Sequence, residues 1–328
     1  MTGRAEDAST CPIAAGQVRL SVCIVTHRRP AGLDRLLKAL APQMSGHSDR
    51  EIVIVNDGSD SHDYQAVIAR SLAGARYLVL PVNRGVAFAR HHAAESARGS
   101  WLVFIDDDCL PPPFWLAWLE AVLDTSPELD LIVGAIKPLA PHPAGFFASV
   151  QVIHALHPYP ERIGDQIRFV TANVAIRTLA YQAAGGFRVR PDFPNAAEDT
   201  ELSSRFSRSA VARRIEWGWY VHHDVGDGFG VNLRRYWRYG YANGILHRLT
   251  SSPPFHDGQA AAAAGRQRAG QIIGVIRRRW QEARRHHRYG LALASALTAA
   301  AIDLAYLAGV RAAVRVSALG LRAEPERT

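Results

Sequence analysis

Residues 101–108 read WLVFIDDD, five apolar residues followed directly by three aspartates. A short, wholly apolar run is typical of a strand that is buried on both faces of a sheet. The run stops at Asp106, Asp107 and Asp108, so the strand is expected to end where three carboxylates crowd together. The stretch therefore predicts a buried strand with a chemically active end.

The same pattern occurs three times before this stretch. Residues 22–25 and 52–55 are β-branched apolar runs that end in polar, turn-prone residues, and residues 77–80 predict a third strand. Residues 32–40 and 86–96 have helical spacing and fill the intervals. Alternating strands and helices predict a doubly wound α/β fold, with a mostly parallel sheet, helices on both faces and a ligand site at the carboxyl ends of the strands.

The second half of the chain is less regular. It predicts a strand over 168–176 and a helix over about 197–207, and residues 251–258 (SSPPFHDG) are typical of a linker. We expect a flexible start at residues 1–18, an α/β domain over 19–250 whose halves are 19–137 and 138–250, and a helical tail over 251–328.

Composition bounds the class of protein. The chain has 328 residues, 48% of them apolar, which suffices for a sizeable core. Three cysteines cannot form a complete disulfide framework, and no apolar segment of a secretory signal follows the polar start, so a cytoplasmic location is expected. The net charge of +8 arises after residue 260, where 12 arginines face 4 acidic residues.

Adjacent carboxylates repel one another, so a fold keeps them together mainly where a cation or hydrogen-bond donors compensate. A solvated acidic turn is the alternative for Asp106 to Asp108. Residues 56–59 (NDGS) and 83–85 (NRG) follow the second and third strands, although an Asp-Gly pair alone is typical of a plain turn. Three polar strand ends at one sheet edge favour a nucleotide site.

At this point the sequence resembles the family 2 glycosyltransferases, which are inverting enzymes of GT-A fold, over roughly residues 19–245. The matching motifs, in family order, are Thr26-x-x-Arg29-Pro30, residues 54–59 (IVNDGS), Asn83-x-Gly85 with Ala89-Arg90, residues 104–108 (FIDDD) with Pro111, Thr171-Ala172-Asn173, Gly185-Gly186-Phe187, and residues 198–202 (EDTEL) with Arg205.

The resemblance implies a nucleoside-diphosphate sugar donor and a divalent cation, Mg²⁺ or Mn²⁺, which prefers hard oxygen ligands. Asp57 would hydrogen-bond the base of the donor, and Asp108 would be the principal metal ligand. The remaining implied donor-site residues are Thr26, Asn83, Gly85 and Arg90 in the nucleotide pocket, Asp106 and Asp107 at the metal and diphosphate, and His223 as a further metal ligand.

Four residues depart from the family pattern. His27 and Arg28 stand where Tyr and Asn are usual, Asn56 replaces the first aspartate of a pair, and His91 follows Arg90 where Asn is common. These changes leave the choice of nucleotide open more than the reaction class.

Glu198 and Asp199 form a second acidic pair at the start of a predicted helix. Carboxylates favour the first helical turn because of the helix dipole, and that interpretation is preferred without the resemblance. The resemblance implies that Asp199 is the catalytic base and that Glu198 positions the acceptor or shares its proton. Glu201 and Arg205, four residues apart, predict a structural ion pair.

His222 and His223 follow the aromatic run 217–220 (WGWY). Neighbouring histidines at a strand end are commonly a surface feature, so the metal role of His223 depends on the resemblance. The tryptophans fit either the core or the wall of an acceptor pocket.

The tail has its own pattern. Residues 291–310 have the length of a membrane span, but alanine dominates them and Asp303 interrupts them, which disfavours a span. The basic belts at 277–280 and 284–288, with 234–241 (RRYWRYGY), favour a peripheral contact with an anionic membrane at its inner face. A solvated helix face is the alternative, and no recognition motif supports nucleic-acid binding.

These features together favour a glycosyltransferase that moves a sugar, with inversion, onto a glycan or lipid-linked acceptor in cell-surface polysaccharide or glycolipid synthesis. Two alternatives stay open. A nucleotidyltransferase would need a glycine-rich phosphate loop after the first strand, which residues 26–32 (THRRPAG) do not supply. A catalytically silent nucleotide-sugar-binding scaffold would not need intact acidic sites.

Overall fold

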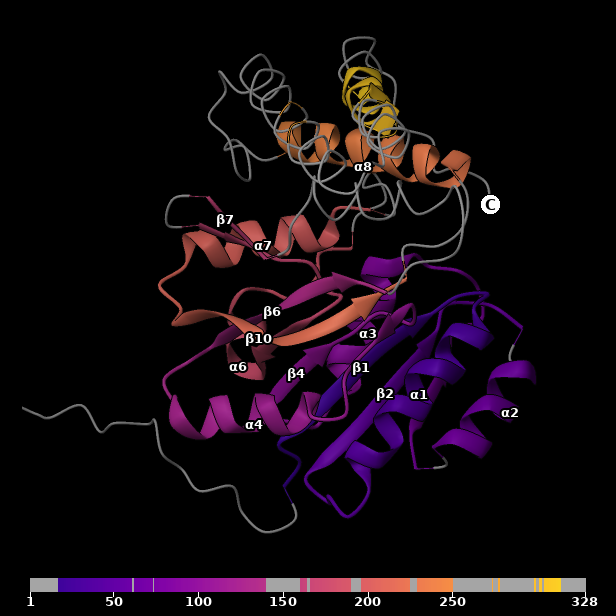
Figure 1. Cartoon of the computed structure of the whole chain (residues 1–328), viewed down its shortest axis with the longest axis vertical. Helices are drawn as coiled ribbons and strands as arrows, with labels where there is room; N and C mark the ends of the chain where they lie inside the picture. The colour runs from indigo at the N-terminus through magenta and orange to yellow at the C-terminus, as the bar shows by residue number, and fades with distance from the viewer. Residues whose placement is uncertain are drawn as a thin grey trace, which may run out of the picture. The chain divides into compact units, whose positions relative to one another are not determined.

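Figure 1 shows the computed structural model of the chain. The residues that the structure describes are 17–60, 62–72, 74–139, 160–163, 166–189, 196–224, 229–249, 273, 277, 298, 301–302 and 304–313. Two compact units divide the chain: the first comprises residues 1–135, 171–186 and 209–222, and the second comprises 136–170, 187–208 and 223–328.

A parallel sheet forms one half of the first unit. Strands β1 (Leu20–Thr26), β2 (Arg50–Asn56), β3 (Arg76–Val79) and β4 (Trp101–Phe104) lie in the order β3-β2-β1-β4 and pair in parallel. In β1 only Val25 is partly exposed, whereas every residue of β2 and β4 is buried, because helices cover both faces. Thr26 pairs with Asn56, and Asn56 pairs with Val79, so three strands end at one edge.

The sheet continues on the β4 side with strands of mixed direction. β9 (Val174–Arg177) pairs antiparallel with both β4 and β6 (Leu131–Pro138), and β10 (Arg213–His223) and the two-residue β5 (Cys109–Leu110) complete the order β3-β2-β1-β4-β9-β6-β10-β5. The Asn173 side chain links β6, β10 and the helix that begins at Trp115. It accepts a hydrogen bond from the Trp115 indole at 3.0 Å and donates to the backbone carbonyls of Ala135 and Trp219.

The helices of the first unit are α1 (Pro30–Met44), α2 (His62–Ser71), α3 (Val86–Ser96), α4 (Trp115–Thr125) and α6 (Thr178–Ala183). α3 packs on β1 and β2, while α1 packs beside α2 and α4. Leu33, Leu36, Leu37 and Leu40 are fully buried on one face of α1, as their spacing predicts. The α/β fold predicted from the alternating pattern is confirmed.

The second unit contains the hairpin β7 (Glu161–Ile163) and β8 (Gln166–Arg168) and the helices α7 (Glu198–Arg208) and α8 (Phe229–Leu249). The Ser203 hydroxyl on α7 donates to the Ile167 carbonyl at 3.1 Å. Residues 304–313 form a helix whose backbone meets α8 at glycines: a Cβ on Gly240 would lie 2.0 Å from the Tyr306 carbonyl oxygen.

Several predictions concern residues outside those that the structure describes. They are the flexible start up to residue 16, the linker at 251–258, the basic belt at 277–280 apart from Arg277, and the whole basic belt at 284–288. Within the described part of the chain, every helix is too short or too polar to cross a membrane.

Candidate functional site

The three aspartates after β4 are each held by a cation or a hydroxyl. The Arg29 guanidinium lies 2.6 Å from an Asp108 oxygen and 3.2 Å from an Asp107 oxygen, and Arg90 on α3 bonds to Asp106. Thr26, the last residue of β1, donates to the second Asp107 oxygen at 2.7 Å. The structure thus brings together Thr26, Arg90 and the triad, as predicted.

Asp107 is the most buried of the three, at 6% exposure. Burial raises its pKa to about 6, and the neighbouring Asp108 adds to the rise, while Arg29 and the Thr26 hydroxyl oppose it. A carboxylate kept in such surroundings needs positive charge nearby to remain ionised. Arg29 supplies part of that charge in the structure.

The backbone that carries Arg29 has an uncommon conformation. Arg28 adopts a φ of +54°, a region that non-glycine residues rarely enter, and the Arg29 amide donates to the Tyr64 hydroxyl at 2.6 Å. The Thr26 hydroxyl also lies 3.3 Å from that Tyr64 oxygen. Tyr64, buried on α2, therefore fixes both ends of the turn that links β1 to α1.

Asp57 ties the loop after β3 to the end of β2. Its two carboxylate oxygens accept hydrogen bonds from the backbone amides of Arg84 at 2.7 Å and Gly85 at 3.0 Å. The side-chain amide of Asn83 donates to the backbone carbonyl of Asp57 at 3.2 Å. Gly58, at φ +72°, allows this approach, because a Cβ there would lie 2.2 Å from the Asn83 nitrogen. Asp57, Asn83 and Gly85 thus meet, as predicted, whereas the role of Asp57 toward a base stays a prediction.

Asn56, which departs from the family pattern, completes the turn after β2. Its amide donates to the Ser59 carbonyl at 3.0 Å and the Tyr77 hydroxyl at 2.9 Å, and its oxygen accepts from the Ser59 amide and hydroxyl. An aspartate would lack the two donors, so asparagine here has a structural reason.

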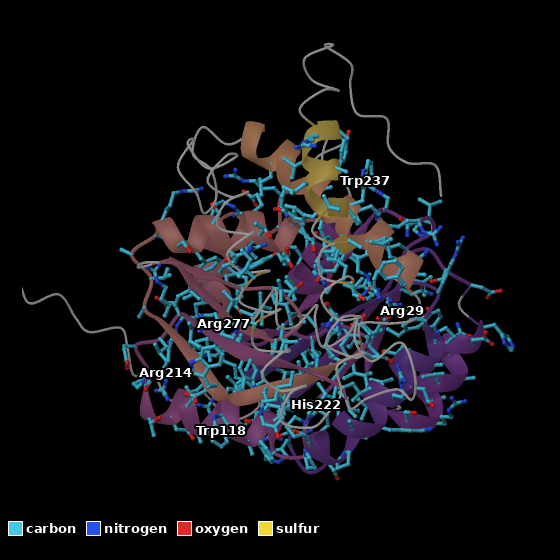
Figure 2. The ribbon with its side chains drawn as sticks, turned by 45° about the horizontal axis from the view of Figure 1, so that its top comes forward. Arg29, Trp118, Arg214, His222, Trp237 and Arg277 are labelled. Atoms are coloured by element: carbon cyan, nitrogen blue, oxygen red, sulfur yellow. The ribbon has the colours of Figure 1, made fainter. Side chains whose placement is uncertain are left out.

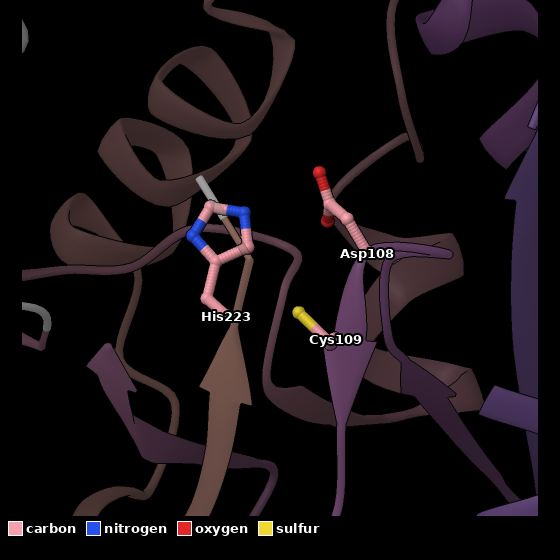
Figure 3. A group of neighbouring side chains, drawn as sticks. All are labelled: Asp108, Cys109 and His223. Atoms are coloured by element: carbon pink, nitrogen blue, oxygen red, sulfur yellow. The ribbon is translucent and has the colours of Figure 1, made fainter. Parts of the chain in front are cut away.

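Figure 3 shows a group of side chains from neighbouring strands of the sheet: Asp108 and Cys109 at β5, and His223, the last residue of β10. Their possible ligand atoms all lie within 4.8 Å of one another. Burial, with Asp108 nearby, raises the pKa of the Cys109 thiol well above its ordinary value, so the sulfur is a neutral thiol. An oxygen and a nitrogen donor remain for a cation.

Glu198 and Asp199 begin α7 in the second unit. Glu198 is 5% exposed, and Asp199 accepts the Thr200 amide at 2.6 Å. Ala197, directly before them, has a φ of +66°, one of two positive-φ residues other than glycine among those described. Arg205 bonds to Glu201 at 2.6 Å, which confirms the predicted structural pair.

The tryptophans divide between the core and the surface. Trp219 is fully buried and stacks on Trp115 at 5.4 Å between ring centroids, so both belong to the core. Trp217 and Trp118 are 59% and 40% exposed. Core or surface could not be decided from the sequence, because both kinds of tryptophan lie in the same aromatic runs.

Two site residues had no role assigned from the sequence. Arg29 belonged to a quoted motif, and its charge next to the turn was the available signal. Tyr64 has the pattern of a core residue on a helix, and no sequence signal marked its hydroxyl.

Comparison with known proteins finds a family match over about the first half of the described α/β part of the chain. Residues 21–138 match the family described as "Glycosyl transferase family 2". An uncharacterized glycosyltransferase of Haemophilus influenzae is 29% identical over 126 residues, which cover 36% of this chain and 39% of that protein. Validoxylamine A glucosyltransferase of Streptomyces hygroscopicus subsp. limoneus is 27% identical over 247 residues, which cover 62% of this chain and 52% of that protein. The chain thus spans about half the length, or less, of these curated relatives.

Solved structures agree in fold. The mannosyltransferase PcManGT from Pyrobaculum calidifontis, in complex with GDP-Man and Mn²⁺, superposes with a TM-score of 0.52 at 16% identity. The match covers 93% of this chain and 76% of the PcManGT chain. S. aureus TarS 1-349 gives a TM-score of 0.51 at 15% identity, covering 92% of each chain. The chain therefore shares its mixed α/β fold with these two structures.

Proposed function

We propose that this chain, whose residues 21–138 form a family 2 glycosyltransferase domain, moves one sugar from a nucleoside diphosphate onto an acceptor hydroxyl with inversion. The observation that carries the proposal is the triad Asp106 to Asp108. The triad lies at the end of β4, next to Thr26 at the end of β1 and Arg29 just after it. Each of its carboxylates contacts a basic group or a hydroxyl group.

The donor set fits a hard divalent cation such as Mg²⁺ or Mn²⁺. Asp108 and His223 offer an oxygen and a nitrogen within 4.8 Å, and Asp106 would add a second carboxylate. When bound, the cation would act as a Lewis acid that offsets charge on the leaving diphosphate. A complex of PcManGT with Mn²⁺ lends support, as a property of that protein.

The chain's own residues would perform the other steps. Thr26, Asn83, Gly85 and Arg90 would line the nucleotide pocket, and Asp57 would bond the base while it holds the 83–85 loop. The acceptor would lose its proton to Asp199 as its oxygen attacks the anomeric carbon from the side opposite the diphosphate. Glu198 would orient that acceptor.

A panel of nucleotide sugars tests the reaction directly. Purified full chain should release nucleoside diphosphate from one donor, more slowly as hydrolysis without acceptor, and a chelator should stop the release until Mn²⁺ or Mg²⁺ is restored. Release of pyrophosphate from a nucleoside triphosphate would instead identify a nucleotidyltransferase. Tight donor binding with no turnover would identify a silent scaffold.

We also propose that the acceptor is a surface glycan or lipid-linked, and that the protein works at the inner face of the membrane. Support comes from α8, where Arg234 and Arg238 are exposed beside Tyr239, which is 42% exposed, a mixture suited to an anionic interface. The net charge after residue 260 has the same sense. Deleting the chain after Gly258 should reduce binding to anionic vesicles, and salt should weaken binding of the full chain; equal vesicle binding by both would reject the idea.

A further inference from the structure

Two arginines compensate the aspartate triad, and they differ in how firmly they are held (Figure 2 labels Arg29). The side chain of Arg90 is 10% exposed and bonds to Asp106 from within α3. The side chain of Arg29 is 43% exposed while its guanidinium reaches Asp107 and Asp108. Arg90 is therefore a fixed part of the site, and Arg29 is the cation that has room to move.

The backbone of Arg29 is anchored although its side chain is not. Its amide donates to the buried Tyr64 hydroxyl at 2.6 Å, and the next residue, Pro30, begins α1. A change of side-chain rotamer can thus carry the guanidinium away from Asp108 without disturbing β1 or α1. The base of the side chain stays beside the triad in either position.

A divalent cation at Asp108 competes with Arg29 for the same carboxylate. The guanidinium lies 2.6 Å from an Asp108 oxygen, and a positive ion bonded to that residue would lie close to it and repel it. Once released, the guanidinium offers five N–H donors in a planar fork, which matches phosphate oxygens in bidentate geometry. A diphosphate bound at the cation would lie near the Arg29 guanidinium.

We propose that Arg29 is the counter-ion of the aspartate triad before a cation binds, and that its guanidinium moves from Asp108 to the donor diphosphate when cation and nucleotide bind. The proposal rests on the function proposed above, because it needs a cation at the triad. Arg29 is a binding residue in this account: its guanidinium offsets the charge of Asp107 and Asp108 before loading and contacts the leaving diphosphate afterwards.

The transfer has two effects of opposite sign in one variant. Arg29→Met removes the competitor, so Mn²⁺ binding without nucleotide should tighten about twofold to fivefold, the size expected of a partly exposed ion pair. The same change removes a phosphate contact, so binding of a nucleoside diphosphate at saturating Mn²⁺ should weaken about tenfold. A purely structural role for Arg29 would weaken both.

The first titration adds Mn²⁺ alone to the full chain. Electron paramagnetic resonance measures the Mn²⁺ that remains free in solution. UDP and GDP are then titrated calorimetrically at saturating Mn²⁺. Arg28→Met is the matched control, since it deletes the same charge one residue away from an exposed side chain. Arg29→Lys keeps the charge but not the fork, and should fall between wild type and Arg29→Met in both titrations.

Circular dichroism checks that each variant is folded. Tighter Mn²⁺ with weaker nucleotide binding in Arg29→Met, and little change in Arg28→Met, supports the transfer. Unchanged or weaker Mn²⁺ binding in Arg29→Met overturns it, as does unchanged nucleotide binding. If the wild type binds no Mn²⁺ at all, the metal assignment itself fails and this proposal fails with it, which separates the two failures.

Discussion

The acidic cluster after β4 and the acidic start of α7 contain the same residue types but are held differently. Asp107 and Asp108 meet Arg29 across 78 and 79 residues of chain, and Asp107 meets Thr26 across 81. Asp199 bonds to the next residue, and Glu201 bonds to Arg205 four residues on. Any helix start can make these contacts within α7, to which Glu201 adds a pair with Arg188 thirteen residues back, whereas only a completed fold makes the contacts of the triad. Long-range compensation is therefore the stronger sign of a built site.

Asp108→Asn should have the largest effect, because it breaks the first cluster at its proposed metal ligand. Loss of several kcal/mol of charge stabilisation on the leaving group would lower turnover by about a thousandfold or more. The measurement is donor turnover at saturating Mn²⁺, with folding checked by circular dichroism. Asp124→Asn is the control, since Asp124 is 63% exposed and pairs with Arg19. Normal turnover in Asp108→Asn, or full activity in excess chelator, would remove the metal assignment.

Asp199→Asn tests whether the acidic start of α7 also carries chemistry. Removing the proposed base while nearly preserving its shape should lower turnover by about a hundredfold to ten-thousandfold and leave donor binding intact. Glu198→Gln should do less harm. If the two effects are reversed, Glu198 is the base. Near-normal turnover in both variants would mean that the acidic first turn of α7 has no catalytic role. Of the two acidic clusters, only the triad would then carry chemistry.

Asp57→Asn should have an intermediate effect. Its carboxylate accepts two backbone amides, and an amide group at this position would leave one of them without an acceptor. We expect a loss of about 1–3 kcal/mol in the free energy of unfolding and a higher KM for the donor, measured by urea unfolding and initial rates. Asp60→Asn, which alters a carboxylate bonded to the exposed His62 amide, is the control. An unchanged donor KM would show that the 83–85 loop does not shape the nucleotide pocket.

The smallest effects concern the two left-handed residues beside the clusters. Arg28→Gly should raise the free energy of unfolding by about 0.5–1 kcal/mol, because relief of the strain exceeds the entropy cost of glycine. Ala197→Gly should change it less, since Ala197 packs with Ala242 and Leu246 and loses that contact. Urea unfolding of the metal-free chain measures both. Equal gains would mean that the methyl of Ala197 contributes nothing to packing.

Sequence alone predicted the repeating part of the fold well, because each strand and helix there has its own local pattern. The helix expected at 86–96 is α3 itself, and the one expected at about 197–207 is α7 at 198–208. The strand expected over 168–176 is instead divided between β8 and β9, with residues 169–173 between them. There the position of Asn173 among distant partners decides the backbone, and no local period encodes it.

The site was predictable as a set of residues but not as a set of bonds. Parallel strands bring their carboxyl ends together, so the neighbourhood of Thr26, Asp57 and the triad follows from the fold class. The pairing of Arg29 with Asp108 does not follow, because which cation reaches a carboxylate depends on side-chain placement across 79 residues. The burial that raises the pKa of Asp107 is likewise a property of the packed structure.

Asn173 has a consequence for how the protein is made. Its side chain bonds to Trp115, Ala135 and Trp219, so the outer strands β6, β9 and β10 cannot lock together until the ribosome has released residue 219. The parallel strands β1 to β4 involve only residues 20–104, and can assemble far earlier during synthesis. A nascent chain stalled before Val174 would thus expose the unpaired side of β4, because β9 is its partner there, and that is the edge that a chaperone would have to protect.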